Sequence, residues 1–280
     1  MEHQMNDALI GSFRDSLIQE ERTLATIEKY VRDMDAFYRW LENDMIINKE
    51  RVIAYKNDLL QKYAVTSVNS MLAALNSFLK HMGWYDCVVR CVKIQKEAFR
   101  SRECELTKEE YYRLLRAAKE TGNTRLYYIM QTICSTGIRV SELEFVTVDA
   151  LLTKRARVRL KGKTRTVILT AELCRRLKQY VKEKHVKSGS IFVTRSGRPV
   201  DRTNILHDMK ALCDRANVER GKVFPHNLRH LFACTYYQME KDLSHLADLL
   251  GHSSVNTTRI YTLVSSEQQA GFIEKLGLVT

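Results

Sequence analysis

Apolar residues recur every three or four positions along the first third of the chain, and this spacing limits its fold more than any other feature. The pattern runs through TLATIEKYVRDMDAFYRWL, residues 23–41, and again through TSVNSMLAALNSFLKHMGW, residues 66–84. Such spacing lines one face of an α-helix with apolar side chains, so both segments are expected to be helices. Thr23 can cap the first, and Gly83 can end the second. With shorter helices around residues 7–19 and 49–63, the sequence predicts a bundle of about four helices.

A polar, charged stretch without clean periodicity, CVKIQKEAFRSRECE at about residues 91–105, follows this bundle. We therefore expect a helical domain over residues 1–95, a linker over 96–104 and a second domain over 105–280. Thr107 and Glu110 have the spacing of a capping box, which marks the start of a helix in the second domain.

The second domain is predicted to mix helices with a little sheet. RVRLKGKTRTVIL, residues 157–169, alternates like a β-hairpin with Gly162 in its turn, so that Val158 and Leu160 face one way. IFVT at 191–194 is expected to be a short strand. Helices are expected around residues 172–184, 203–216, 227–239 and 243–250. The fold class is therefore mainly α with a small β-sheet, in which a four-helix domain precedes an α+β domain.

The net excess of positive charge lies in the second domain. The chain of 280 residues has a net charge of +12, yet residues 1–100 hold 14 Lys and Arg against 14 Asp and Glu. Residues 151–230 alone hold 21 basic against 6 acidic residues. A solvated surface could have this composition, but a concentrated basic segment favours binding to a polyanion such as nucleic acid.

Neither a membrane span nor a secretory signal is evident in the sequence. No apolar run approaches the roughly 20 residues that a span needs, and the N-terminal MEHQMNDALIGSFRDSLIQEE lacks a basic stretch before an apolar one. The seven cysteines form no CxxC pair. A scattered, odd-numbered set indicates reduced thiols, so we expect a cytoplasmic protein without a structural zinc site.

Four short segments carry residue types suited to chemistry at a phosphodiester: TGIRVSEL (136–143), LKGKTR (160–165), PHNLRH (225–230) and GHSSVNTTRIY (251–261). Displacement at phosphorus adds negative charge to the non-bridging oxygens, which two guanidiniums can hold through paired donors. Arg139 and Arg229 suit this role, and Glu142 can orient Arg139 from one turn away. No cluster of carboxylates accompanies them, as a two-metal nuclease would require.

Simpler interpretations of these segments stay open. Gly251 can close one helix while Ser253 or Ser254 caps the next. His226 and His230 lie four residues apart on an expected helix and could bind zinc, although no third ligand is evident.

Taken together and in this order, the four segments resemble the tyrosine recombinase (phage integrase) family, in its Xer-like form without an arm-binding domain. The resemblance spans the whole chain and implies a SAM-like core-binding domain before the catalytic one. It implies no metal and no cofactor. The catalytic residues that it implies are Arg139, Lys161, His226, Arg229, His252 and Tyr261. It places Glu142 and His230 in support of them, and the hairpin residues Arg157, Arg159, Lys163 and Arg165 on DNA.

The resemblance implies a site-specific recombinase in which Tyr261 attacks DNA to form a 3′-phosphotyrosyl intermediate and frees a 5′-hydroxyl. Lys161 would protonate that leaving oxygen, but the hairpin turn is one residue shorter than is usual in the family, so Lys163 competes with it. His252 would hydrogen-bond the phosphate. The leaving group and the nucleophile exchange roles on rejoining, so no ATP is needed.

The resemblance also implies partners and a cellular setting. The substrate would be double-stranded DNA with paired core sites, on which four copies assemble through the C-terminal segment 265–280, alone or with a related partner chain. The setting would be a bacterial cytoplasm, at the nucleoid. Integration and excision of a mobile element is the expected role. Resolution of chromosome dimers, DNA inversion, a type IB topoisomerase-like activity and a non-catalytic DNA-binding regulator are the alternatives.

Overall fold

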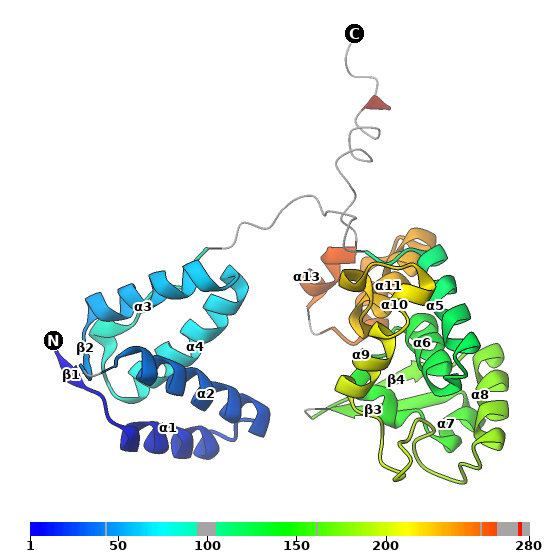
Figure 1. Cartoon of the computed structure of the whole chain (residues 1–280), viewed down its shortest axis with the longest axis horizontal. Coiled ribbons are helices and arrows are strands. Elements are labelled where there is room, and N and C mark those ends of the chain that lie inside the picture. The colour runs from blue at the N-terminus through cyan, green and yellow to red at the C-terminus, as the bar shows by residue number, and fades with distance from the viewer. Residues whose placement is uncertain (43, 94–104, 161, 253, 262–273, 276–280) are drawn as a thin grey trace. The chain divides into compact units, whose positions relative to one another are not determined.

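The computed structural model divides the chain into two compact units, Met1–Lys96 and Glu97–Thr280, which Figure 1 shows. The structure describes all residues except 43, 94–104, 161, 253, 262–273 and 276–280, and it does not describe the side chains of residues 160 and 163. Each unit has its own hydrophobic core. The expected C-terminal exchange segment, 265–280, lies almost entirely outside the described residues.

The first unit is the expected bundle, built from α1 (Asp7–Gln19), α2 (Leu24–Trp40), α3 (Lys49–Lys62) and α4 (Val65–His81). Short strands β1 (His3–Gln4) and β2 (Ile46–Ile47) pair antiparallel, and the 3₁₀ helix η1 (Tyr85–Cys87) follows α4. Phe13, Phe37 and Phe78 are fully buried in the core, as the three- and four-residue spacing predicts. Gly83 has a φ of 75° just after α4, where a glycine ends a helix without strain.

The second unit contains most of the helices. Its elements are α5 (Lys108–Glu120), α6 (Thr124–Thr136), η3 (Val140–Phe145), α7 (Val148–Thr153), β3 (Arg155–Leu160), β4 (Lys163–Ile168), α8 (Ala171–Glu183), α9 (Arg202–Lys210), α10 (Cys213–Ala216), η4 (Arg220–Lys222), α11 (Pro225–Glu240), α12 (Leu243–Leu250), α13 (Val255–Thr258) and η5 (Arg259–Tyr261). The capping box of Thr107 and Glu110 opens α5 as predicted. β3 and β4 form the predicted hairpin, in which Val158 lies opposite Arg165. The mainly helical fold class is confirmed.

Two expected elements differ from the structure. IFVT does not form a strand: Val193 makes only an isolated bridge with Pro199, and proline has no N–H with which to extend a ladder. The single helix expected over 203–216 is two helices, α9 and α10. It breaks because the N–H of Leu212 bonds the carbonyl of Met209, three residues back, which tightens the chain into a new turn.

Two glycines bring the elements of the site together. Gly137 ends α6 with a φ of 64°, and a side chain there would collide with the ring of Phe232 on α11. Gly251 ends α12 with a φ of 65°. Both positions use the left-handed conformation that glycine adopts readily. The end of α6 can therefore approach α11 closely, and the end of α12 can approach Arg165 of β4. No helix among the described residues is long and apolar enough to cross a membrane.

Candidate active site

Arg139 lies just after the end of α6 and begins η3. Its backbone N–H donates to Oε2 of Glu142 at 2.9 Å, and its Nη1 donates to Oε1 of the same carboxylate at 2.9 Å. Its Nη2 donates to the carbonyl of Gly251 at 3.2 Å. Glu142 is only 2% exposed, whereas the Arg139 side chain is 38% exposed. The buried carboxylate therefore orients a guanidinium that remains open to solvent on one side, as the three-residue spacing suggested.

Arg229 is a fully buried arginine, on α11, whose first helical residue is Pro225. Its Nη1 donates to the carbonyl of Gly137, and its Nη2 donates to the carbonyl of Leu250 at 2.8 Å. Burial and the nearby Arg139 lower the pKa of the Arg229 guanidinium to about 10. It therefore stays charged at neutral pH, held in place by carbonyls at the ends of α6 and α12.

His252 follows α12 and has a defined hydrogen-bonding state. Nη2 of Arg229 lies 3.1 Å from Nε2, and Oγ1 of Thr258 lies 2.8 Å from Nδ1. A guanidinium can only donate. Nε2 must therefore accept, so Nδ1 carries the proton and donates to Thr258. Burial, Arg229 and Arg139 lower the pKa of His252 to about 4, so the ring is neutral at pH 7.

This state differs from the role expected for His252, since Nε2 has no proton to donate to a phosphate. Nε2 would have to part from Arg229 and gain a proton, either from outside the ring or by a change of tautomer, before it could make that hydrogen bond.

Tyr261 ends η5 and is 6% exposed. It packs with Ala233 of α11 and with Leu246 and Leu250 of α12. Its ring centroid lies 6.1 Å from that of His252, in a stacked arrangement, and 5.0 Å from that of His230. The short chain from Gly251 to Tyr261, with Ser254 capping α13, thus brings the tyrosine and His252 side by side.

The His230 ring packs against the Tyr261 ring and has two polar neighbours of its own. Its Nε2 lies 3.3 Å from Oε1 of Glu105 and 3.1 Å from Sγ of Cys234. The zinc interpretation gains nothing here: within the described ranges, the one trio of His, Cys, Asp or Glu close enough to share a metal ion is His3, Asp86 and Cys87 in the first unit.

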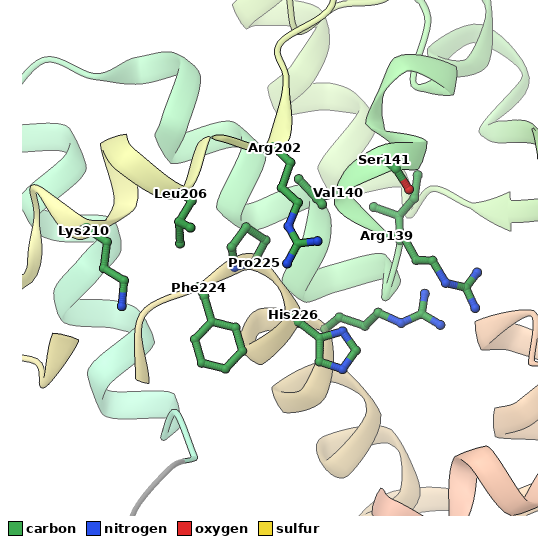
Figure 2. Close-up of a pocket in the computed structure, with 11 residues that line it drawn as sticks. Arg139, Val140, Ser141, Arg202, Leu206, Lys210, Phe224, Pro225 and His226 are labelled. Atoms are coloured by element: carbon green, nitrogen blue, oxygen red, sulfur yellow. The ribbon is translucent and has the colours of Figure 1, made fainter. Parts of the chain in front are cut away.

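A cavity of about 470 Å³ opens beside the two arginines. Arg139, His226 and Arg229 line one part of it, and Arg202 and Lys210 of α9 line another; Figure 2 shows Arg202 between Lys210 and the Arg139–His226 group. The sequence analysis missed Arg202 and Lys210. They lie with Leu206 at four-residue intervals in the most basic part of the chain, a pattern that places all three on one face of a helix.

The hairpin residues assigned to DNA lie in different surroundings. Arg157 and Arg159 are exposed on β3, where they can reach a ligand. Arg165 on β4 instead turns inward: its Nη2 bonds Oε2 of Glu142, and its Nη1 donates to the carbonyl of Leu249 at 2.7 Å. Its two terminal nitrogens bond within the protein, because Arg165 shares the inward face of the hairpin with Val158 and Val167. Lys161 and the side chain of Lys163 lie outside the described part of the chain.

Residues 105–268 match the family model described as the phage integrase family. The chain belongs to this family. It is 26% identical over 289 residues to the tyrosine recombinase XerC of Pediococcus pentosaceus, covering 93% of this chain and 94% of that protein. It is 31% identical over 273 residues to the tyrosine recombinase XerD of Bifidobacterium longum, covering 87% and 88%.

The fold matches solved recombinases as well. A lambda integrase, in the structure of its tetramer bound to a Holliday junction, aligns with a TM-score of 0.71 at 18% identity, covering 91% of this chain and 76% of that one. The family membership and fold identify a tyrosine recombinase, an enzyme of site-specific DNA recombination that breaks and rejoins DNA strands.

Proposed function

We propose that Arg139 and Arg229 hold the two non-bridging oxygens of the scissile phosphate while Tyr261 attacks the phosphorus. The observation that carries this proposal is that both guanidiniums are fixed by protein carbonyls and line one cavity with His226. Arg229 also contacts His252, whose ring stacks on Tyr261. Donors fixed before the reaction supply about 2.7–4 kcal/mol each where one has been removed. Arg202 and Lys210, further along the cavity, suit the neighbouring phosphates of the same strand.

The proposed reaction balances without an external energy source. The Tyr261 oxygen forms a bond to phosphorus, the bond to the 5′-oxygen breaks, and a lysine of the hairpin gives that oxygen a proton. The tyrosine loses its own proton to His226 or to water. Rejoining reverses these steps, so the phosphodiester bond energy is kept in the phosphotyrosine. Tyr261 is buried in the described state, so its ring has to turn toward the cavity before attack.

A nicked suicide substrate tests the nucleophile. Tyr261→Phe removes one hydroxyl and should bind DNA normally but form no covalent adduct. Tyr237→Phe is the matched control, because Tyr237 packs against the same cluster and should form the adduct like the unmodified protein. An adduct recovered from Tyr261→Phe would show that another residue attacks.

The general acid is tested separately. If Lys161 protonates the leaving oxygen, Lys161→Ala should lose cleavage of ordinary DNA and recover it when sulfur replaces the 5′-bridging oxygen, because a thiolate leaves without a proton. Rescue of Lys163→Ala and not of Lys161→Ala would assign the role to Lys163.

We also propose that four copies assemble on paired core sites by docking the C-terminal segment of one copy on the next. An apolar groove of about 360 Å³ between α5, α6 and α11 can receive it, lined by Tyr112, Leu115, Leu231, Phe232, Tyr236 and Met239 among others. Met239 is 78% exposed, and residues 265–280 supply Phe272, Ile273, Leu276 and Leu278 to cover it.

Two variants test this docking. A chain that ends at Ser266, and Met239→Glu in the full chain, should each bind a half-site normally but lose cooperative binding to a full site in gel-shift titrations. Cooperative binding by both variants would refute the proposed docking. A related partner chain would be indicated if only a mixture of chains assembled.

The cellular role that we propose is integration and excision of a mobile element. Element ends or inverted core repeats beside the gene would support it, whereas a site at the chromosome terminus would favour dimer resolution. Relaxation of supercoiled DNA without joining of two sites would favour a type IB topoisomerase-like activity. Recombination between two sites on a plasmid would exclude that activity and a regulator without catalysis.

A further inference from the structure

Three successive carbonyls at the end of α12 each accept a hydrogen bond from a different arginine. Leu249 accepts from Arg165 at 2.7 Å, Leu250 from Arg229 at 2.8 Å, and Gly251 from Arg139 at 3.2 Å. The last carbonyls of a helix have no partner within the helix and carry partial negative charge. The end of α12, from which His252 and Tyr261 follow, is therefore held by three guanidiniums.

Arg165 and Arg139 also share one carboxylate. Glu142 bonds Nη2 of Arg165 through Oε2 and Nη1 of Arg139 through Oε1. Because Glu142 is buried, its two oxygens fix the separation of the two guanidiniums. A shift of Arg165 would therefore act on Arg139 through Glu142 and on His252 through the end of α12.

Gly251 makes room for this arrangement. A side chain at Gly251 would collide with Cδ and Nε of Arg165. Nε of Arg165 is buried and has no hydrogen-bond partner among the described residues, so the guanidinium is used through its two terminal nitrogens. Its position depends on those two contacts and on the absence of a Cβ atom at Gly251.

We infer that Arg165 is a positioning residue for cleavage: it ties the hairpin strand β4 to Arg139 through Glu142 and to the His252–Tyr261 segment through the carbonyl of Leu249. The inference rests on the roles proposed above for Arg139, His252 and Tyr261. β4 begins at Lys163, two residues after Lys161, so Arg165 links the hairpin that carries both candidates for the general acid to the other parts of the site. In this function it does not contact DNA.

The charge of Arg165 gives a second quantity to measure, the pKa of His252. His252 faces four cationic or titratable groups, Arg229, Arg139, Arg165 and His226, and all four lower its pKa in addition to burial. Removing the charge at Arg165 should raise the pKa of His252 above its value of about 4. A residue that acted only by packing would leave this titration unchanged once the fold was intact.

Arg165→Ala and Arg165→Lys test the inference against Arg113→Ala. Arg113 is the matched control because it also donates to carbonyls at the end of a short helix, those of Ala216 and Asn217, without reaching the cavity. The cleavage rate in a single turnover at saturating protein should fall roughly 100-fold in Arg165→Ala, as for a misplacement of about 1 Å. The rate should fall less in Arg165→Lys, and added guanidinium should partly restore it in Arg165→Ala. Arg113→Ala should cleave at the normal rate.

The salt dependence of binding separates positioning from DNA contact. A phosphate contact contributes about 0.9 to the slope of log affinity against log salt concentration, so a positioning residue leaves the slope unchanged. A slope reduced by about that amount in Arg165→Ala, with a normal rate at saturation, would overturn the inference.

An NMR titration of His252 in the free protein tests, without any cleavage assay, whether the charge of Arg165 acts on that ring. The resonance should titrate at a higher pH in Arg165→Ala than in the unmodified protein and in Arg113→Ala, and an unchanged titration would overturn the inference. If the unmodified protein formed no adduct with the suicide substrate, the proposed function would fail while this titration would still test Arg165.

Discussion

Glu142→Gln should destabilise the second unit without affecting the first. The Glu142 carboxylate is 2% exposed and accepts from the N–H of Arg139, from Nη1 of Arg139 and from Nη2 of Arg165. Glutamine has the same shape but one acceptor oxygen and no charge. The guanidiniums of Arg139 and Arg165 would then lie beside an amide NH₂ group. That group is a hydrogen-bond donor, as they are, and cannot replace the lost acceptor.

The expected loss follows from the burial of this group. Breaking a buried ion pair by removing one partner costs 3–5 kcal/mol, and the glutamine oxygen keeps part of the bonding, so we expect about 3 kcal/mol. For a unit of this size, that loss lowers the melting temperature by roughly 6–12 °C.

The stability difference between Glu142→Gln and the unmodified protein should depend on pH. Burial alone would raise the pKa of Glu142, but hydrogen bonds from Arg165 and from the Arg139 backbone outweigh it and hold the pKa below its ordinary value. A carboxyl whose pKa is lowered on folding stabilises the protein above its unfolded value of about 4.3, and this stabilisation is lost as the pH falls through the folded value. The difference between the two proteins should therefore be largest at pH 7 and shrink below about pH 4.3.

Thermal melting followed by two probes measures the effect. Both tryptophans, Trp40 and Trp84, lie in the first unit, so tryptophan fluorescence should be unchanged while the circular dichroism transition of the second unit moves. Glu172→Gln is the matched control, since Glu172 also bonds two arginines, Arg175 and Arg176, but at the surface, where such pairs contribute little. Equal melting curves for Glu142→Gln and Glu172→Gln at pH 7 would refute the reasoning.

Three further predictions concern the site and its binding to DNA. Thr258→Val keeps the buried shape but leaves Nδ1 of His252 without its acceptor, so single-turnover cleavage should fall about fivefold, equivalent to roughly 1 kcal/mol; an unchanged rate would mean that Thr258 does not hold the ring. Gly251→Ala should cost roughly 1–2 kcal/mol for its left-handed backbone, and its effect on cleavage should be less than additive with Arg165→Ala in a double-mutant cycle. DNA affinity should fall by about 10³–10⁵ between 50 and 200 mM salt if six to ten phosphates are contacted, and a flat response would exclude a clamp on the DNA backbone.

Local signals predicted the helices well because each signal acts within a few residues. α1 and α12 cover the ranges expected for them, around 7–19 and 243–250, and the box at Thr107 forms both of its hydrogen bonds. The prediction at 191–194 was wrong because an apolar, β-branched run needs a pairing partner. The segment around Pro199 pairs with it only briefly: the N–H of Thr194 bonds Arg198 and the N–H of Val200 bonds Phe192, but Pro199 between them has no N–H to donate.

The site was less predictable because its decisive contacts join segments far apart in the sequence. Residue types and their order selected the candidate catalytic side chains, but alternation along a hairpin cannot tell which face meets a charged interior. Arg165 was therefore assigned to DNA together with Arg157, although β4 turns it toward Glu142. The protonation state of His252 could not be predicted either, because it depends on the guanidinium of Arg229, which approaches Nε2 from α11.

The charges of the site explain why it suits an anion that is not part of the protein. Arg139, Arg165 and Arg229 bring three positive charges around one carboxylate, that of Glu142, and the rest of the compensation comes from helix-end carbonyls, which carry only partial charge. Burial and, after it, this excess of positive charge lower the pKa values of Arg229 and His252. A phosphate with one negative charge would relieve it, and the charge that develops on the non-bridging oxygens during displacement would relieve it further. The protein maintains the unfavourable arrangement through the packing of α11 and α12, so the guanidiniums need not reorganise when the transition state forms.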